Sequence, residues 1–415
     1  MPQLLLVAAA AALARASAQN TTFHTAHYTS AVKPDEVPVK WDALTDAELL
    51  KRLPPWYAPN YRISDAFASR LPFTEEVQAD IWAHQNPQSC ENRTFVLQGS
   101  KPAGLGYLMG VANFPLAWAM EHGHILVLHQ GFAAAQAEGE QDSYCSSQQL
   151  RGWDCFFMPL SNCSDHIGKR VERNFKWAPT ADPLVPAKWQ RRWAETNQTG
   201  SLLQWWRAQT TAYATRLNAR TARELALRRL RSAAAGAAPL PLPPGTISVH
   251  VRHGDKYKEL ELMSWGDHLG AVNAAARAQG WKERALFVTT DDSEVAAAVR
   301  AGVPGWTAYI QPCEAPYGAR CAEQVRCRTT ETDVNPGYAT SDAAADLTLF
   351  SLQGLLTALE ATHFAGQRGS NWVRVIDRLR MVMVGGAASF STPYIDVGAS
   401  LPANLGGAGT YKGCC

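Results

Sequence analysis

The residues best suited to chemistry follow a short apolar stretch in the second half of the chain. A strand is expected over 247–251, with Arg252 at its end and Asp255, Lys256 and Glu259 close behind. Parallel sheets bind ligands at the carboxyl ends of their strands. A guanidinium there can hold a diphosphate through parallel hydrogen bonds, which lysine cannot reproduce. The two carboxylates and the amine would lie beside the same ligand, whereas the alternative is an exposed charged loop.

Two further groups belong to the same edge of the expected sheet. Side chains alternate along a strand, so His250 points to the same face as Arg252. The strand expected over 285–289 runs into Asp291 and Asp292. Such paired carboxylates can bind a ribose, pin an arginine or cap the next helix, and the sequence leaves these roles open.

Two turns that follow strands could hold a phosphate. One contains Gly104, Leu105 and Gly106, and the other contains Gly369 and Ser370. Glycines let backbone N–H groups approach an anion, and a helix N-terminus favours negative charge. A tight turn or a structural N-cap explains either pattern equally well.

Composition and missing motifs exclude several other classes of function. The chain has 39 Lys+Arg and 37 Asp+Glu, a net charge of +2 without a basic stripe, which argues against a nucleic-acid partner. The sequence lacks a P-loop, a G-x-S-x-G nucleophile elbow, an H-E-x-x-H motif and a D-x-D pair. We therefore expect no metal site, and the loosely spaced histidines are interpreted as structural.

The elements that must position these residues alternate between strand and helix. Strands are expected over 94–97, 124–128, 247–251, 285–289, 306–310 and 362–365, and helices over 74–82, 107–121, 202–231, 264–278, 293–301 and 346–359. This rhythm is typical of doubly wound parallel sheets. An Ala/Pro/Gly run at 233–245 predicts the main domain boundary. The predicted fold class is α/β, with two halves around a crevice.

The first residues predict passage through the secretory pathway. Residues 4–14 are apolar and 16–18 read A-x-A, which favours a cleaved signal peptide at 1–18 over a short anchor. N-x-S/T sequons begin at Asn20, Asn92, Asn162 and Asn197. The nine cysteines contain no C-x-x-C pair, so disulfides are expected in an oxidising lumen, with at least one thiol left over.

Together these segments resemble the GDP-fucose-dependent fucosyltransferases, most closely the core α1,6-fucosyltransferases and the nodulation fucosyltransferases. The motifs are Q-N-P-x-x-C ending at Cys90, the Gly104 turn, W-x-x-x-F-x-P-L-S from Trp153, H-V-R-x-x-D-K from His250 and F-V-T-T-D-D from Phe287. The resemblance covers about residues 81–379.

The resemblance implies a GT-B-like pair of Rossmann-like α/β domains and inverting, metal-free transfer of L-fucose from GDP-fucose to the 6-hydroxyl of a GlcNAc. By position Arg252 and His250 correspond to the donor's diphosphate arginine and its neighbouring histidine. Glu259 corresponds to the general base, with Lys256 and Asp255 beside it. The remaining donor-side positions are Gly104, Leu105, Gly106, Asp291, Asp292, Gly369 and Ser370.

The resemblance also pairs Cys90 with Cys163, and more weakly Cys145 with Cys155. The expected partners are GDP-fucose and a GlcNAc-containing glycan or glycoprotein, with a homodimer as a further possibility. The expected location is the Golgi lumen or the secreted fraction. The expected organisation is a leader (1–18), a stem (19–75), an N-terminal α/β domain (76–240), a GDP-sugar domain (241–390) and a tail (391–415).

Two departures from the family pattern leave alternatives open. The second of two consecutive arginines is His253 here, mostly neutral near pH 7, so weaker or pH-dependent diphosphate binding is expected. The acid that reads guanine falls on Gly354, where Asp346 or Gln353 could substitute. The alternatives are another acceptor, such as a chitin-type oligosaccharide or a protein hydroxyl, and an inactive protein that binds GDP-sugars or glycans.

Overall fold

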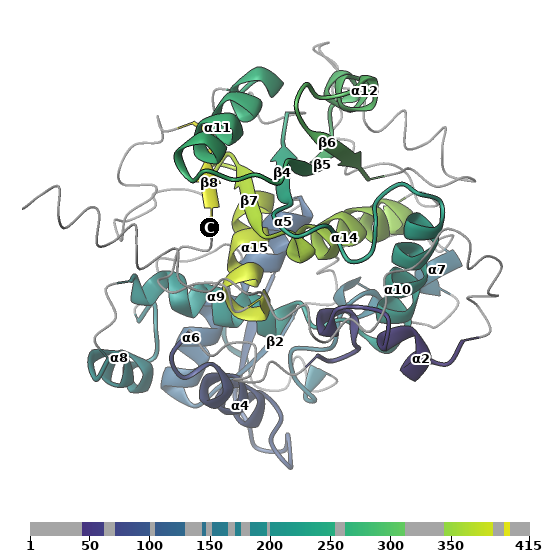
Figure 1. Cartoon of the computed structure of the whole chain (residues 1–415). Coiled ribbons are helices and arrows are strands. Elements are labelled where there is room, and N and C mark those ends of the chain that lie inside the picture. Colours follow the sequence, from purple (N-terminus) through teal and green to yellow (C-terminus); the bar gives the residue numbers. More distant parts are fainter. Residues whose placement is uncertain are drawn as a thin grey trace, which may run out of the picture.

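In the computed structural model the chain forms two separate parallel sheets, with helices around and between them (Figure 1). The residues that the structure describes are 44–61, 71–99, 104–128, 143–146, 152–164, 171–175, 183–196, 200–253, 262–311, 344–384 and 394–398. The expected α/β class with two parallel-sheet halves, the GT-B-like arrangement, is confirmed. The expected leader lies outside the described residues.

The smaller sheet is built around one fully buried strand. β1 (Phe95–Gln98) lies between β2 (Ile125–Leu128) and β3 (Val171–Phe175), and both pairings are parallel. The predicted β-α-β unit is therefore present. Its crossover is two helices, α5 (Leu105–Val111) and α6 (Asn113–His122), rather than the single helix predicted over 107–121. β3 was not predicted, because four of its five residues are exposed and its sequence, VERNF, has no apolar run.

The larger sheet has five parallel strands in the order β6-β5-β4-β7-β8. These strands are β4 (Ile247–Val251), β5 (Ala285–Thr290), β6 (Thr307–Ile310), β7 (His363–Gly366) and β8 (Tyr394–Asp396). The first four match the predicted strands closely. The edge strand β8 was missed, because three residues are too few to show a period.

The two faces of the larger sheet pack against different helices. Ile247, Val249 and Val251 lie in one apolar cluster with residues of α11 (Trp265–Ala278) and α12 (Ser293–Ala301). Phe287 and Phe364 point to the opposite face and join the larger core of the molecule. The alternation expected for a strand thus directs His250 toward this larger core.

Two helices lie between the sheets and join them. α14 (Ala344–Glu360) packs on β4, and α15 (Asn371–Leu379) packs on both α5 and α9 (Leu202–Ala214) (Figure 1). A π-helical turn, η8 (Arg380–Val384), continues α15. One hydrophobic cluster therefore extends from the N-terminal half into the C-terminal half.

The helical stretch predicted over 202–231 is two helices. α9 ends at Ala214, and α10 (Ala219–Ala234) begins after Asn218, whose side chain accepts a hydrogen bond from the N–H of Thr221 at 2.8 Å. The Ala/Pro/Gly run that follows packs against the core, since Ala238, Leu240 and Leu242 are buried.

A buried ion pair between α10 and α14 also binds a tyrosine of the N-terminal segment 44–61. Arg229 on α10 binds both carboxylate oxygens of Glu360 at 2.8 and 2.7 Å, and each side chain is 1% exposed. The hydroxyl of Tyr57, in η3 (Pro55–Tyr57), donates to the same carboxylate at 3.2 Å. The shorter helix α2 (Asp46–Leu50) precedes η3 and buries Leu49. Residues 44–61 thus pack onto the α/β core.

Four further described helices belong to the N-terminal half, which also contains two disulfides. They are α4 (Thr74–Gln85), α7 (Ser143–Ser146), η4 (Gly152–Cys155) and α8 (Ala187–Ala194). Cys145 is bonded to Cys155, and Cys90 to Cys163, as the resemblance implied.

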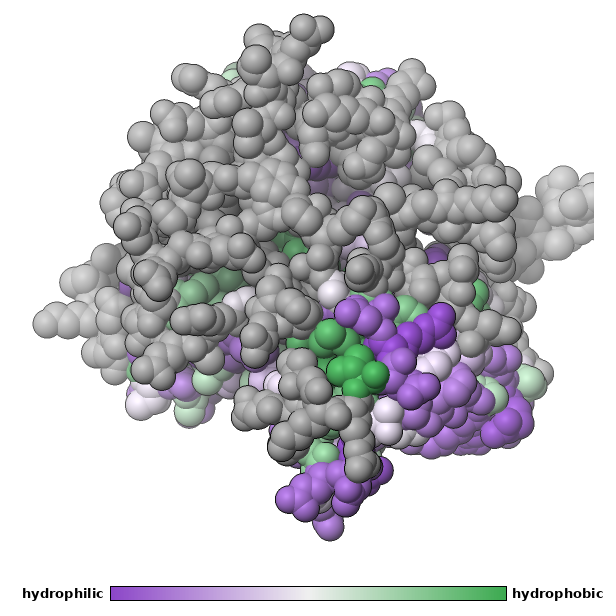
Figure 2. All heavy atoms as spheres, turned by 180° about the vertical axis from the view of Figure 1, so that it is seen from behind, coloured by the Kyte–Doolittle hydropathy of each residue, from purple (hydrophilic) through white to green (hydrophobic). Residues whose placement is uncertain are grey.

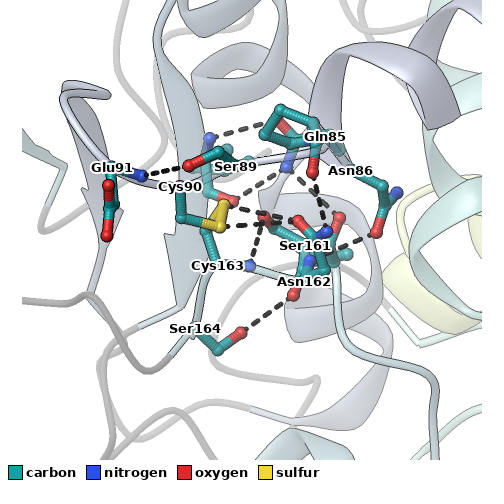
Figure 3. Close-up of a disulfide and its surroundings, with 12 residues drawn as sticks. Gln85, Asn86, Ser89, Cys90, Glu91, Ser161, Asn162, Cys163 and Ser164 are labelled. Carbon is teal, nitrogen blue, oxygen red and sulfur yellow. Dashed lines mark hydrogen bonds between the residues drawn. A yellow bond between two sulfur atoms is a disulfide. The ribbon is translucent and has the colours of Figure 1, made fainter.

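The residues around Cys90–Cys163 explain the Q-N-P motif (Figure 3). The amide of Gln85 pairs with the backbone of Leu126, donating to its carbonyl at 2.8 Å and accepting from its N–H at 3.1 Å. Asn86 accepts from the N–H of Asn162 at 3.1 Å. The motif therefore ties the end of α4 to β2 and to the loop that carries Cys163.

Figure 2 shows one face of the molecule, on which part of the described surface is visible. In Figure 2 a small hydrophobic group lies beside a larger hydrophilic area. Among the described residues, the large hydrophobic side chains that are exposed are Val171 and Leu184, each at 39%. Within these same ranges no helix has the length and apolar character needed to cross a membrane.

Candidate functional site

The carboxyl ends of β4 and β5 bring a cation and a carboxylate together. Arg252 follows β4, Asp291 follows β5, and the guanidinium Nη1 forms an ion pair with Asp291 Oδ2. Both side chains are about one quarter exposed, at 26% and 23%. Asp291 Oδ1 also accepts the backbone N–H of His253 at 2.8 Å. Of the three roles open for this acid, the structure shows the pinned arginine, which holds Arg252 at the sheet edge.

Asp292 takes a structural role that the sequence also allowed. It is the N-cap of α12, and its Oδ1 accepts from the N–H groups of Glu294 at 2.7 Å and Val295 at 3.4 Å. Burial opposes ionisation of this carboxyl, but hydrogen bonds from His253 and these two N–H groups outweigh it and lower the pKa of Asp292. Asp292 is therefore an anion whose Oδ1 accepts the two N–H groups and whose Oδ2 contacts the ring of His253.

His250 is held in the core as a neutral ring. Its Nδ1 lies 2.9 Å from Thr289 Oγ1 on the neighbouring strand, and the residue is 7% exposed. Burial, with a smaller contribution from the charge of Arg252, lowers the pKa of His250 to about 3. Its Nε2 is buried and has no hydrogen-bond partner. His250 therefore adds no positive charge at this edge of the sheet. Thr289 was not predicted as the partner of His250, although the two residues lie opposite each other in the register of β4 and β5.

The ring of His253 is bound by protein groups. The residue is 9% exposed, and its ring contacts Asp292 and the carbonyl of Met263. The expectation that His253 makes diphosphate binding weaker or pH-dependent stays a prediction. Two consecutive residues after a strand point to different sides, so Arg252 and His253 diverge.

The two expected phosphate turns lie side by side. A Cβ on Gly106 would approach the backbone N of Trp372 to 2.8 Å, so α5 and the first turn of α15 are in close contact. Gly104 is the N-cap of α5, and Leu105 begins the helix and packs on the core. Ser370 is the N-cap of α15, where its side chain makes no capping bond.

The structure thus brings together several predicted site residues and leaves others undescribed. β7 pairs with β4, so the turn with Gly369 and Ser370 follows the strand beside the one that ends at Arg252. Asp255, Lys256 and Glu259 lie outside the described residues. Within the described ranges, no group of three or more His, Cys, Asp or Glu could hold a metal ion.

Gly354, where the resemblance expects the acid that reads guanine, is closely packed against neighbouring side chains. A Cβ on Gly354 would clash with Gln311 Oε1 and would approach Thr289 Cγ2 to 3.2 Å. Gln311 Nε2 donates to the carbonyl of Phe350 at 2.5 Å. Gln353 is buried and bonds Thr357 on its own helix at 3.2 Å. The side chain of Asp346 is not described. Gly354 therefore accommodates the amide of Gln311.

We expect Gly106→Ala to lower the free energy of unfolding by about 1–3 kcal/mol, because the new methyl group meets backbone atoms that cannot rotate away. Gly104→Ala is the matched control, since a Cβ there has nothing within 4 Å and the φ of −63° suits alanine. It should change the stability by less than about 0.5 kcal/mol. Urea denaturation measures both, and equal losses would contradict the close contact between α5 and α15.

Two buried histidines predict that acid destabilises the fold. Burial lowers the pKa of His363 to about 4, as it lowers that of His250 to about 3. Below the ordinary pKa of about 6.5 the unfolded chain binds protons that these folded rings refuse, so stability is lost as the pH falls toward 4 and then 3. Each ring should cost about 2 kcal/mol between pH 7 and pH 5.

Denaturation curves of His250→Asn and His363→Gln at both pH values test this expectation. Each variant should lose less stability on acidification than the parent chain, whereas exchange of the exposed His122 for Gln should change nothing. An identical pH dependence in all four proteins would contradict the burial argument.

The comparisons with known proteins found matches among solved structures alone. No family model and no curated protein matches the chain. The chain is similar to NodZ α-1,6-fucosyltransferase soaked with GDP-fucose, at 15% identity and a TM-score of 0.37 over 69% of this chain and 93% of that one. It is also similar to a mutant of Arabidopsis thaliana FUT1 in complex with GDP, at 10% identity and a TM-score of 0.39 over 80% of each chain. For POFUT1 in complex with GDP the values are 11% and 0.34, over 75% of this chain and all of that one.

Proposed function

We propose that the chain is a glycosyltransferase that uses GDP-fucose and needs no metal. The observation that carries the proposal is Arg252, held at the carboxyl end of β4 by Asp291 and next to the strand that leads into Ser370. A sugar donor of this kind leaves as a diphosphate, which requires a fixed positive charge. Arg252 can supply that charge, and the N-terminus of α15 can add N–H groups.

The proposed reaction inverts the anomeric carbon of fucose. The acceptor hydroxyl oxygen attacks C1 from the face opposite the diphosphate and forms the new C–O bond. The bond from C1 to the β-phosphate oxygen breaks, and its electron pair leaves with GDP. The hydroxyl proton passes to Glu259, which the resemblance assigns as general base, with Lys256 and Asp255 beside it. Arg252 stabilises the charge that develops on the leaving group.

The proposed acceptor is the 6-hydroxyl of a GlcNAc, with the core GlcNAc of N-glycans as the first candidate. This choice is supported by the H-V-R-x-x-D-K motif from His250 and by the order of the other motifs along the chain. A chitin-type oligosaccharide or a protein hydroxyl would use the same donor half. A linkage analysis of the product distinguishes these acceptors.

The proposed location is the lumen of the secretory pathway. The disulfides Cys90–Cys163 and Cys145–Cys155 support it, because such bonds persist in oxidising compartments. The leader expected at 1–18 and the sequons point the same way. A homodimer remains part of the proposal and is tested by light scattering.

The deciding experiment incubates the purified chain with GDP-fucose, GDP-mannose or UDP-GlcNAc and a GlcNAc-terminated glycopeptide. We expect GDP release and fucosylated product with GDP-fucose alone, and the same rate in EDTA. GDP binding by calorimetry without transfer to any acceptor would favour an inactive binding protein. Absence of GDP binding would overturn the proposal.

A further inference from the structure

The ring of His253 joins three segments of the chain. Its Nε2 lies 2.8 Å from the carbonyl oxygen of Met263, and its Nδ1 lies 2.5 Å from Asp292 Oδ2. Its backbone N–H donates to Asp291 at 2.8 Å. One residue therefore connects the end of β4, the N-cap of α12 and the residue just before the N-cap of α11.

Both ring contacts are made to acceptors. A carbonyl oxygen and a carboxylate oxygen accept hydrogen bonds, whereas a neutral imidazole has one N–H and can satisfy one of them. The imidazolium form has two N–H groups and satisfies both. The side chains of His253 and Asp292 are 11% and 9% exposed, so their contact is largely shielded from water.

Two other charged or titratable residues lie near His253, namely Asp291 and His268. Asp291 forms an ion pair with Arg252 and accepts the backbone N–H of His253. His268 on α11 bonds the carbonyl of Ser264 through Nδ1 at 2.9 Å. Burial is the main cause that lowers the pKa of His268, and the nearby His253 lowers it further. His268 is thus neutral and adds no positive charge near the ring of His253.

We propose that His253 is a positioning residue for the proposed reaction. The ring of His253 bonds the carbonyl of Met263, so the two ends of the intervening sequence are held together. In sequence, Glu259 lies between these ends. His253 therefore sets the separation of these two ends, while Asp291 holds Arg252 in place. The inference rests on the proposed function for the role of Glu259, but the bridge itself does not.

The two ring bonds can be removed separately. The amide nitrogen of asparagine can take the place of Nδ1, so His253→Asn keeps a donor to Asp292 and loses the bond to Met263. The longer glutamine places its amide nitrogen near Nε2, so His253→Gln keeps the Met263 bond and loses the donor to Asp292. Both variants are neutral, which makes them a matched pair for charge.

We expect His253→Asn to lower kcat about 10²-fold and His253→Gln about tenfold, because a small misplacement of a reacting group costs about this much. The Kd for GDP, measured by calorimetry, should stay within about threefold of the parent in both, since the ring is turned away from Arg252. Equal kcat losses in the two variants would overturn the proposal. So would a much weaker affinity for GDP with kcat unchanged, which would make His253 a diphosphate ligand.

A second measurement separates this inference from the proposed function. Hydrogen exchange of the unliganded chain should show faster exchange at residues 262–266 in His253→Asn than in His253→Gln, whether or not the chain transfers fucose. If the parent chain is inactive and this difference is present, the bridge stands and the proposed function fails. If exchange is the same in both variants and the parent, the bridge is refuted.

Discussion

Replacement of Arg252 by lysine is expected to lower kcat/KM for GDP-fucose by about 10²–10³-fold, the usual cost of removing one electrostatic donor to a developing charge. Arg252 Nη1 is bound to Asp291 at the sheet edge, and a guanidinium in this place can hold a diphosphate through parallel hydrogen bonds. Lysine is a point charge on a flexible stem and cannot serve both partners in this geometry. Initial rates of GDP release at several donor concentrations measure the loss.

The affinity for GDP should fall together with kcat/KM, because the proposed contact of Arg252 with the diphosphate exists in the ground state as well. Asp291→Asn should give a smaller loss, about tenfold, since the amide retains the shape but no longer fixes the guanidinium by charge. Arg300→Lys, an exposed exchange on α12, is the matched control and should be silent. Full activity in Arg252→Lys would remove the observation on which the proposed function depends.

The strands of the larger sheet were predictable because burial and sequence agree there. β4 and β5 are apolar runs of strand length flanked by polar residues, and their carboxyl ends carry the charged groups. The juxtaposition of Arg252 and Asp291 then follows from topology, since adjacent parallel strands end at the same edge. The choice between ligand contact and capping could not be made from spacing alone, because Asp291 and Asp292 differ in which side of the turn they face.

Contacts between distant segments were beyond the sequence. Nothing in the pattern around Gly106 identifies Trp372 as its neighbour, and the close approach comes from the way α15 packs between the sheets. The run at 233–245 resembles a free linker in composition, yet its apolar residues are buried and the carbonyl of Ala238 accepts from Arg229 at 2.9 Å. Composition indicates which local conformations a segment favours, whereas tertiary packing determines where the segment lies in the fold.

Glu259 is expected to be the residue whose loss separates chemistry from binding. Glu259→Gln keeps the size of the side chain and its ability to form hydrogen bonds, but removes the basic oxygen that takes the acceptor proton. General-base catalysis contributes about 10²–10⁴-fold, so kcat should fall by at least about 10²-fold. The Kd for GDP should stay within about threefold, because the base acts on the side of the sugar opposite the diphosphate.

Glu294→Gln is the matched control for this variant. Glu294 is an exposed acid in the first turn of α12, beside Asp292 and at the same edge of the sheet, and its exchange should leave kcat unchanged. Single-turnover measurements distinguish slow chemistry from slow release of GDP. A Glu259→Gln enzyme that retains its turnover would shift the base to Asp255 or Lys256, and the same assay on Asp255→Asn would decide between them. Loss of GDP binding in Glu259→Gln would instead assign this residue to the donor site, and the separation between the charge-neutralising side at Arg252 and the proton-accepting side would fail.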